Sequence, residues 1–260
     1  MTFQRGSPWF GWSNHNPQAR VTLFCLPFSG GGASVFNPWR RAFPQDVEVR
    51  PVHLPGREER IEEPGKLSAD VIADAMAQRI DRPFALYGHS MGARLGFEVL
   101  RRLADLGVRD PVRFYAAACP PPDVTDTVAQ CVTLPDEQFI ATLIRRLGAP
   151  EAIGDVAELR DLLLPVLRTD MGWSYRYRYE PGAPLRTTIV ALAGEGDTEA
   201  TPKTMAGWSG HGQRFNLFTF PGGHFFLRTA EQELVAFLAQ DLLGDLGVSA
   251  PTVGVHREGA

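Results

Sequence analysis

Short apolar runs alternate with amphipathic stretches along the chain, and runs of this kind are typical of buried parallel strands. The runs that predict strands are residues 20–26, 47–53, 84–87, 112–118, 188–193 and 216–220. Because helical patterns lie between these runs, the chain is expected to adopt an α/β fold. The expected fold has a doubly wound, mostly parallel central sheet with helices on both of its faces.

Helical patterns fill the gaps between the predicted strands. After Ser68, an N-cap residue, the apolar residues Ile72, Met76 and Ile80 recur every four positions, and Leu67 can pack onto Ile72 as a hydrophobic staple. Further helices are predicted over residues 91–106 and 229–243.

Residues 134–179 break the alternation, because they hold two or three helical patterns and no strand pattern. The patterns are separated at residues 148–150. The apolar positions are Phe139, Leu143 and Leu147 in the first helix and Leu159, Leu162, Leu163, Val166 and Leu167 in the second. Most of these side chains are expected to be core faces, and the insertion as a whole is placed to act as a lid. We expect one domain over residues 1–243 and a flexible tail over residues 244–260.

Composition excludes several classes of function. The 260 residues carry a formal net charge of −4 without a long basic run, which argues against a nucleic-acid partner. Cys25, Cys119 and Cys131 are too irregularly spaced for a disulfide framework or a zinc site, so we expect small core residues and a reducing compartment. We expect no metal and no cofactor. Residues 1–18 lack the apolar stretch of a signal peptide or membrane span, and the protein is therefore expected in the cytoplasm. With no long exposed apolar stripe, it is expected to be a monomer.

Residues 88–92 lie between a predicted strand and a predicted helix, and their pattern is Gly-x-Ser-x-Gly. A serine on such a sharp turn has strained backbone angles, and Gly88 and Gly92 allow the strand and the helix to crowd together. The turn lifts the hydroxyl out of the sheet and aims free amides of the helix at the reacting oxygen. Ser90 is therefore the candidate nucleophile.

A serine needs a histidine base at neutral pH, and His224 has the most suitable position. It follows the last predicted strand and precedes a helix, at the sheet edge where a base must lie. His53, at the end of a predicted strand, is a rival, whereas His89 is expected to be structural. The remaining histidines lie in expected flexible ends, His15 and His256, or in a glycine-rich loop, His211.

The acid that orients the base should come between the serine and the histidine in the chain. Asp197 follows a predicted strand directly, in a loop whose glycines permit a tight turn. Glu195 and Glu199 could substitute for it. Asp123 and Asp126 are a second pair of rivals, because they follow the predicted strand that ends near Cys119.

Two backbone amides are needed to hold the oxyanion of an acyl-transfer reaction. One is expected from Met91, the residue after the nucleophile, and one from the loop over residues 27–32. This loop lacks the lysine and spacing of a P-loop and the full dinucleotide fingerprint. Between Phe28 and Ser29 as the second donor we prefer Ser29.

With these residues in place, the chain resembles the type II thioesterases of polyketide synthase and nonribosomal peptide synthetase pathways, within the α/β-hydrolase superfamily. The resemblance covers about residues 19–243. It rests on segments 26–33, 54–57, 63–64, 88–93, 134–135, 164–168 and 221–226, and on Arg60, Phe97, Glu98, Asp170, Tyr175, Tyr177 and Tyr179.

The resemblance implies an α/β-hydrolase fold with a helical lid and a triad of Ser90, His224 and Asp197. It also implies that the substrate is an acyl group held as a thioester on the phosphopantetheine arm of an acyl or peptidyl carrier protein. Such enzymes edit, because they remove stalled or wrong acyl groups. The chain departs from the family pattern after Asp197, where residues 198–202 are more polar, and at residues 173–174 of the lid.

Three other functions fit parts of the pattern. A dedicated chain-releasing thioesterase for one product would use the same triad, and so would an esterase or lipase that acts on oxygen esters. A non-catalytic module that binds carrier proteins would depend on basic contacts instead. The candidates for such contacts are Arg57, Arg60, Arg145 and Arg146, whose simpler interpretation is a solvated surface.

Overall fold

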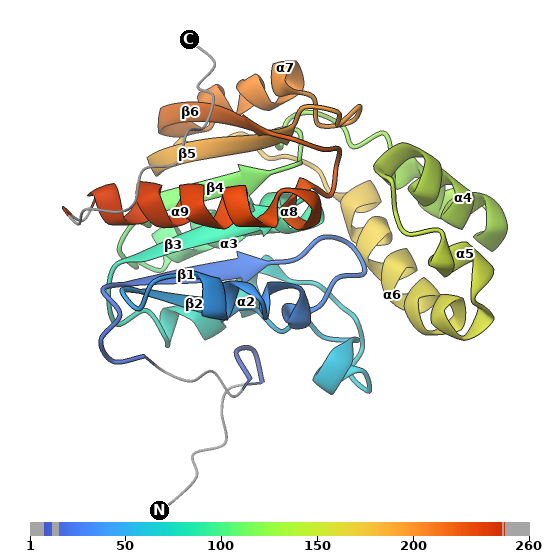
Figure 1. The fold of residues 1–260 in the computed structure, drawn as a ribbon, viewed down its shortest axis with the longest axis horizontal. Helices are drawn as coiled ribbons and strands as arrows, with labels where there is room; N and C mark the ends of the chain where they lie inside the picture. The colour runs from blue at the N-terminus through green and yellow to red at the C-terminus, as the bar shows by residue number, and fades with distance from the viewer. Residues whose placement is uncertain (1–7, 12–15, 246, 248–260) are drawn as a thin grey trace, which may run out of the picture.

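Six parallel strands form the central sheet in the computed structural model of the chain, which describes residues 8–11, 16–245 and 247 (Figure 1). The strands are β1 (Val21–Leu26), β2 (Val47–Pro51), β3 (Phe84–His89), β4 (Arg113–Ala117), β5 (Leu185–Gly194) and β6 (Gly212–Phe220). Their order in the sheet is β2-β1-β3-β4-β5-β6, and every neighbouring pair is parallel. The predicted parallel α/β fold is confirmed.

The predicted strands differ from the observed ones mainly at their ends. β5 begins at Leu185 and β6 at Gly212, each earlier than predicted. β6 is an edge strand whose first residues are partly or fully exposed, so polar side chains there hide the strand from an apolar pattern. β2 ends at Pro51, so the prediction that His53 ends this strand is wrong.

Helices cover both faces of the sheet because successive strand residues point to opposite sides. Phe24 and Leu26 of β1 lie in a core shared with α2 (Ala69–Ala77) and α3 (Met91–Asp105). Leu23 and Cys25 lie in a second core, shared with α1 (Trp39–Ala42) and α9 (Glu231–Asp245). The remaining short helices beside the sheet are α7 (Pro202–Met205) and α8 (Phe226–Thr229).

The helix predicted after Ser68 is shorter than expected. Ser68 caps α2 through its Oγ, which accepts the N–H of Val71 at 3.4 Å, and Ile72 and Met76 are buried. The helix ends at Ala77, so the prediction that Ile80 continues it is wrong. Beyond the end of the helix, the carbonyl of Arg79 accepts a hydrogen bond from the Arg50 guanidinium on β2.

The insertion contains three helices, α4 (Asp136–Leu147), α5 (Ala152–Asp155) and α6 (Ala157–Arg176), as predicted for residues 134–179. They lie beside the sheet at the end toward which the strand arrows point (Figure 1). Phe139, Leu143, Leu167 and Met171 form a separate small core within this lid. Leu162, by contrast, is 55 % exposed, and its side chain is not part of a core face.

The segment predicted as a flexible tail begins as helix, because α9 continues to Asp245. Except for residue 247, the rest of that segment lies outside the described residues, as do His15 and His256. No helix in the described part of the chain is long and apolar enough to cross a membrane.

Candidate active site

Ser90 lies on the turn that joins β3 to α3, with φ 54° and ψ −122°. This backbone conformation is strained for a residue with a side chain. A Cβ on Gly88 would collide with the backbone of Gly92 and Ala93, and a Cβ on Gly92 would collide with the carbonyl oxygens of Leu26 and Pro27. The predicted elbow is therefore present, and its two glycines are required by close backbone contacts.

His224 lies in the loop between β6 and α8, as predicted, and faces the serine. Its Nε2 is 2.9 Å from Ser90 Oγ. The histidine is 7 % exposed, and its loop turns at Gly222, whose φ of 108° is one that other residues rarely adopt. The loop thus holds a buried imidazole at the carboxyl edge of the sheet.

Asp197 completes a continuous chain of hydrogen bonds. Its Oδ2 accepts the Nδ1–H of His224 at 2.8 Å, and its Oδ1 accepts the backbone N–H groups of Glu199 and Ala200 at 2.9 and 3.0 Å. Burial raises the pKa of Asp197, but the hydrogen bond and charge of His224 and the two backbone donors outweigh it, so this pKa lies below its usual range. The ionised carboxylate only accepts, so Nδ1 carries the proton and Nε2 can accept from Ser90.

The loops that carry the acid and the histidine are fastened to each other. Gly196 N–H donates to the carbonyl of Gly222 at 2.8 Å, and a Cβ on Gly194 would collide with the carbonyl of Gly223. The glycines predicted to permit a tight acid loop therefore also bring it against the histidine loop. This contact fixes the spacing between Asp197 and His224.

The rival histidines have other partners. His211 Nε2 is 2.8 Å from Asp123 Oδ1, and His53 lies 4.0 Å from Glu59. His89, expected to be structural, bonds through Nδ1 to the Tyr87 hydroxyl and through Nε2 to the carbonyl of His224, at 3.0 and 2.8 Å. Burial lowers the pKa of His89 to about 3. The neutral ring holds the loop of the candidate base through its hydrogen bond to the carbonyl of His224.

The rival acids are engaged elsewhere too. Glu199 forms two hydrogen bonds of 2.7 Å with the Arg146 guanidinium of α4, and Asp126 lies 3.6 Å from Arg94. Glu195 is exposed. Of the candidates weighed from the sequence, the structure brings Ser90, His224 and Asp197 together.

The predicted oxyanion loop runs past the serine. Met91 is the first residue of α3, where backbone N–H groups have no partner within the helix. Ser29 lines the cavity that contains Ser90, whereas the Phe28 ring packs against His89 and Phe225, with centroids 6.0 and 4.9 Å apart. The roles of Met91, Ser29 and Phe28 remain predictions.

A buried ion pair that sequence reasoning missed supports this loop. The Arg57 guanidinium binds both carboxylate oxygens of Asp170 in α6, at 2.7 and 2.8 Å, and donates to the carbonyl of Gly31 at 3.0 Å. Asp170 also accepts the N–H of Gly30 at 2.8 Å and is fully buried. The pair therefore joins the lid to the predicted oxyanion loop. The only sequence signal was that both residues belong to segments on which the family resemblance rests.

The arginines considered as docking contacts do not form an exposed basic patch. Arg57 and Arg60 are buried, at 5 % and 9 % exposed, and Arg146 is paired with Glu199. Of these four residues, Arg145 is exposed. The docking interpretation is wrong for Arg57 and Arg60, because both side chains are buried and form ion pairs within the molecule.

Two adjoining cavities lie at the serine and beside it, with Ser29, Leu147 and Met171 as shared lining residues. One of about 200 Å³ is lined by Ser90, Met91 and His224, and we call it the serine cavity. Another of about 570 Å³ lies between the oxyanion loop and the lid, and we call it the apolar cavity. Its aliphatic lining includes Leu147, Ile153, Leu159, Leu163, Val166 and Leu167. The cavity that is lined by Ser90 and His224 therefore adjoins a hydrophobic space under the lid.

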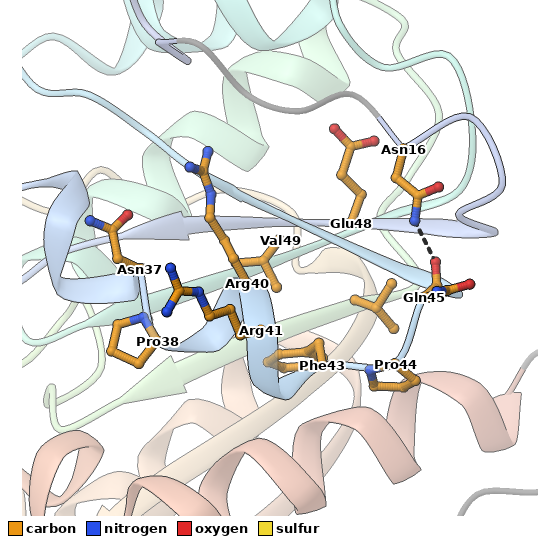
Figure 2. A pocket seen from close by; sticks show the side chains of 11 residues that line it. Asn16, Asn37, Pro38, Arg40, Arg41, Phe43, Pro44, Gln45, Glu48 and Val49 are labelled. Atoms are coloured by element: carbon orange, nitrogen blue, oxygen red, sulfur yellow. Dashed lines mark hydrogen bonds between the residues drawn. The ribbon is translucent and has the colours of Figure 1, made fainter.

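A further cavity, of about 810 Å³, lies away from the triad between α1 and the edge strand β2 (Figure 2). Arg40, Arg41, Gln45 and Glu48 are among its lining residues, and none of its lining residues lines the two cavities at the serine. The Asn16 amide closes one end by donating to the carbonyl of Gln45 at 2.7 Å (Figure 2). Its separation from Ser90 excludes it as the place of acyl transfer by this triad.

The three cysteines are buried and free, as predicted for small core residues. Burial raises the pKa of Cys119 and of Cys131 to about 11, so both thiols stay protonated at neutral pH. Ser90, by contrast, lies within hydrogen-bond distance of His224 and so remains the candidate nucleophile.

Residues 21–242 match the family described as Thioesterase domain. The chain is 35 % identical over 248 residues to the gramicidin S biosynthesis protein GrsT of Aneurinibacillus migulanus, covering 93 % of this chain and 97 % of GrsT.

Solved structures of thioesterases have the same fold. The RedJ thioesterase of the prodiginine pathway in Streptomyces coelicolor superposes with a TM-score of 0.80 at 31 % identity, over 87 % of this chain and 92 % of RedJ. The type II thioesterase BorB of the borrelidin cluster gives 0.79 at 33 % identity, over 92 % and 99 %. The resemblance found in the sequence is confirmed, and the chain belongs to the thioesterase domain family.

Proposed function

We propose that this chain is an editing, type II thioesterase that hydrolyses acyl-phosphopantetheine thioesters on carrier proteins of polyketide or nonribosomal peptide synthesis. The observation that carries the proposal is the unbroken relay from Asp197 through His224 to Ser90 beside the cavities under the lid. Its relatives GrsT and BorB are, respectively, a protein of gramicidin S biosynthesis and a type II thioesterase of the borrelidin cluster.

In the first step, Ser90 Oγ attacks the thioester carbonyl carbon while His224 Nε2 takes the hydroxyl proton. The amide N–H groups of Met91 and Ser29 hold the oxyanion of the tetrahedral intermediate. The carbon–sulfur bond then breaks, and His224 returns the proton to the leaving thiolate. The products of this step are an acyl ester of Ser90 and the free pantetheine thiol.

In the second step, water attacks the acyl ester while His224 Nε2 takes one of its protons. Collapse of the second tetrahedral intermediate expels Ser90 Oγ, which recovers its proton from the histidine. Asp197 remains ionised throughout and stabilises the imidazolium that forms in each step. The carrier leaves with a free thiol and is ready to be loaded again.

The partner in this proposal is an acyl or peptidyl carrier protein, and the chain acts on it as a cytoplasmic monomer, with neither a nucleic acid nor a membrane as a partner. Residues 1–243 form its single domain, with the lid at residues 134–179. The apolar cavity of about 570 Å³ supports an acyl substrate, because its lining is mostly aliphatic.

A series of acyl groups on one carrier protein tests the proposal. Acetyl, propionyl, malonyl and long-chain acyl carriers are offered at equal concentration, and release of free acid is measured for each. Editing predicts release of several short acyl groups. A single sharp optimum at one large product would instead indicate a chain-releasing enzyme, and equal rates on oxygen esters without a carrier would indicate an esterase.

A further inference from the structure

The serine cavity adjoins two other cavities, with which it shares lining residues. It shares Ser29, Leu147 and Met171 with the apolar cavity. On another side it shares Val124, Thr125, Asp126 and Ser174 with a cavity of about 490 Å³ that is lined by Tyr175, Tyr177 and Tyr179. We call this last space the tyrosine cavity. Because neighbouring spaces share walls, we take the three as one path for the substrate, with the candidate nucleophile in its middle section.

The position of His224 gives this path a direction. A thioester carbon carries the acyl chain and the sulfur as its two substituents, and His224 must deliver a proton to the sulfur as it leaves. His224 lines the serine cavity and does not line the apolar cavity. The apolar cavity is instead lined by residues 28–32 of the predicted oxyanion loop and by the lid. The sulfur side of the substrate therefore extends away from the apolar cavity.

The chemical character of the side chains that line the two outer cavities supports the same direction for the substrate. Aliphatic side chains of the lid, such as Ile153 and Leu163, dominate the apolar cavity. The tyrosine cavity offers aromatic and hydroxyl groups together with Arg178, an exposed residue. Phosphopantetheine carries two amides and a phosphate, which require hydrogen-bond partners and positive charge, whereas an acyl chain requires neither.

Charged side chains line both outer cavities. At the apolar cavity, the Glu58 carboxylate accepts the N–H groups of Ala33 and Ser34, Arg57 is paired with Asp170, and the Arg228 guanidinium lies over the Phe28 ring. At the tyrosine cavity the Arg178 guanidinium is held at the rim by hydrogen bonds of 2.9 and 2.7 Å to the carbonyls of Tyr175 and Tyr177. This mouth can therefore attract a phosphate.

Two carboxylates also line the tyrosine cavity, and both have partners. Asp123 accepts from His211 at 2.8 Å, and Asp126 lies 3.6 Å from the Arg94 guanidinium. Arg94 is 2 % exposed, lines the same cavity and donates to the carbonyl of Val124 at 3.0 Å. The Arg94 guanidinium offsets the negative charge of Asp126, and its hydrogen bond to Val124 braces the loop that lies between the tyrosine cavity and the serine cavity.

We propose that the phosphopantetheine arm reaches Ser90 through the tyrosine cavity with its phosphate at Arg178, and that the acyl chain lies in the apolar cavity. The assignment rests on the proposed thioesterase function and deepens it. A cavity of about 150 Å³ holds one benzene molecule, so the apolar cavity of about 570 Å³ has room for roughly twenty carbon-sized atoms. Medium-chain acyl groups are thus among the substrates of this enzyme.

The first experiment compares acetyl-phosphopantetheine with acetyl-N-acetylcysteamine, which lacks the phosphate. We expect Arg178→Ala to raise the KM of the phosphate-bearing thioester about two- to fivefold more than that of the phosphate-free one, the range of an exposed ion pair. The matched control Arg186→Ala, on exposed Arg186 of β5, should change neither. Equal KM changes for both thioesters would overturn the route.

The second experiment tests the acyl end. Ile153→Phe adds bulk to the apolar cavity and should lower kcat/KM for an octanoyl thioester about tenfold more than for an acetyl thioester. The matched control Val156→Phe changes a 44 % exposed residue that does not line the cavity, and it should leave the ratio unchanged. Equal losses for both acyl groups would overturn the assignment. A wild-type protein that hydrolyses none of these thioesters would overturn the proposed function itself.

Discussion

At the scale of single residues, the site depends on a few side chains. The rival histidines and acids are excluded from the triad because the structure places them with other partners or at the surface. Glycines at 88 and 92 predicted an elbow because only small residues fit there, and the observed backbone contacts give the same reason. Asp197 could not be separated from its acidic neighbours by pattern alone. The choice depends on which carboxylate accepts the His224 proton, and that is a contact between residues 27 positions apart.

The role of Asp197 is tested by replacing it with an isostere. Asp197→Asn keeps the shape but can donate to Nδ1, which leaves His224 in the wrong tautomer, and we expect kcat to fall about 10⁴-fold. Steady-state hydrolysis of an acyl carrier measures the loss. Glu195→Gln, an exposed neighbour in the same loop, should keep ordinary activity. If Glu195→Gln loses as much as Asp197→Asn, the acid is misassigned.

The same carboxyl makes a prediction about pH. Hydrogen bonds hold the pKa of Asp197 below its usual range, so its ionisation stabilises the folded state above the pKa of the unfolded chain. That contribution is lost as the pH falls through the lower pKa of the folded state. Urea unfolding from about pH 6 to about pH 3 should therefore show a larger loss of unfolding free energy in the wild type than in Asp197→Asn. Parallel losses in both proteins would contradict this.

At the scale of elements, the lid is tied to the sheet by charge as well as by apolar packing. The pair of Asp170 with Arg57 joins α6 to the predicted oxyanion loop, and Arg146 joins α4 to the loop of the candidate acid. Helix patterns predicted the lid helices well because each has its own apolar face. They could not predict these ties, because Arg57 and Asp170 are 113 residues apart and become partners only in the fold.

Removing one partner of the buried pair should be costly. Asp170→Ala leaves the Arg57 charge buried without a counter-charge, so we expect the free energy of unfolding to fall by about 3–5 kcal/mol. Urea denaturation measures it. Asp161→Ala, which breaks the exposed contact of 3.8 Å with Arg160 on the same helix, should cost less than about 1 kcal/mol. Similar costs for the two variants would show that burial of the pair is unimportant.

At the scale of the whole molecule, the sequence predicted the parallel sheet, the helices on its two faces and the lid, because buried strands and helices have distinct periods. It missed the beginnings of β5 and β6, because polar residues conceal β6 at the sheet edge. The path formed by the three adjoining cavities could not be predicted either, since its walls come from the lid, the oxyanion loop and the loop after β4. Such a path exists only once the whole chain has folded.

The covalent intermediate tests the central claim most directly. Wild type, Ser90→Ala and His224→Ala are mixed with an acetyl-carrier thioester, quenched within one turnover and analysed by peptide mass spectrometry. We expect an acetyl adduct on the Ser90 peptide of the wild type, with turnover lost by several orders of magnitude in both variants. Turnover that persists in Ser90→Ala, with no adduct at Ser90 in the wild type, would contradict it.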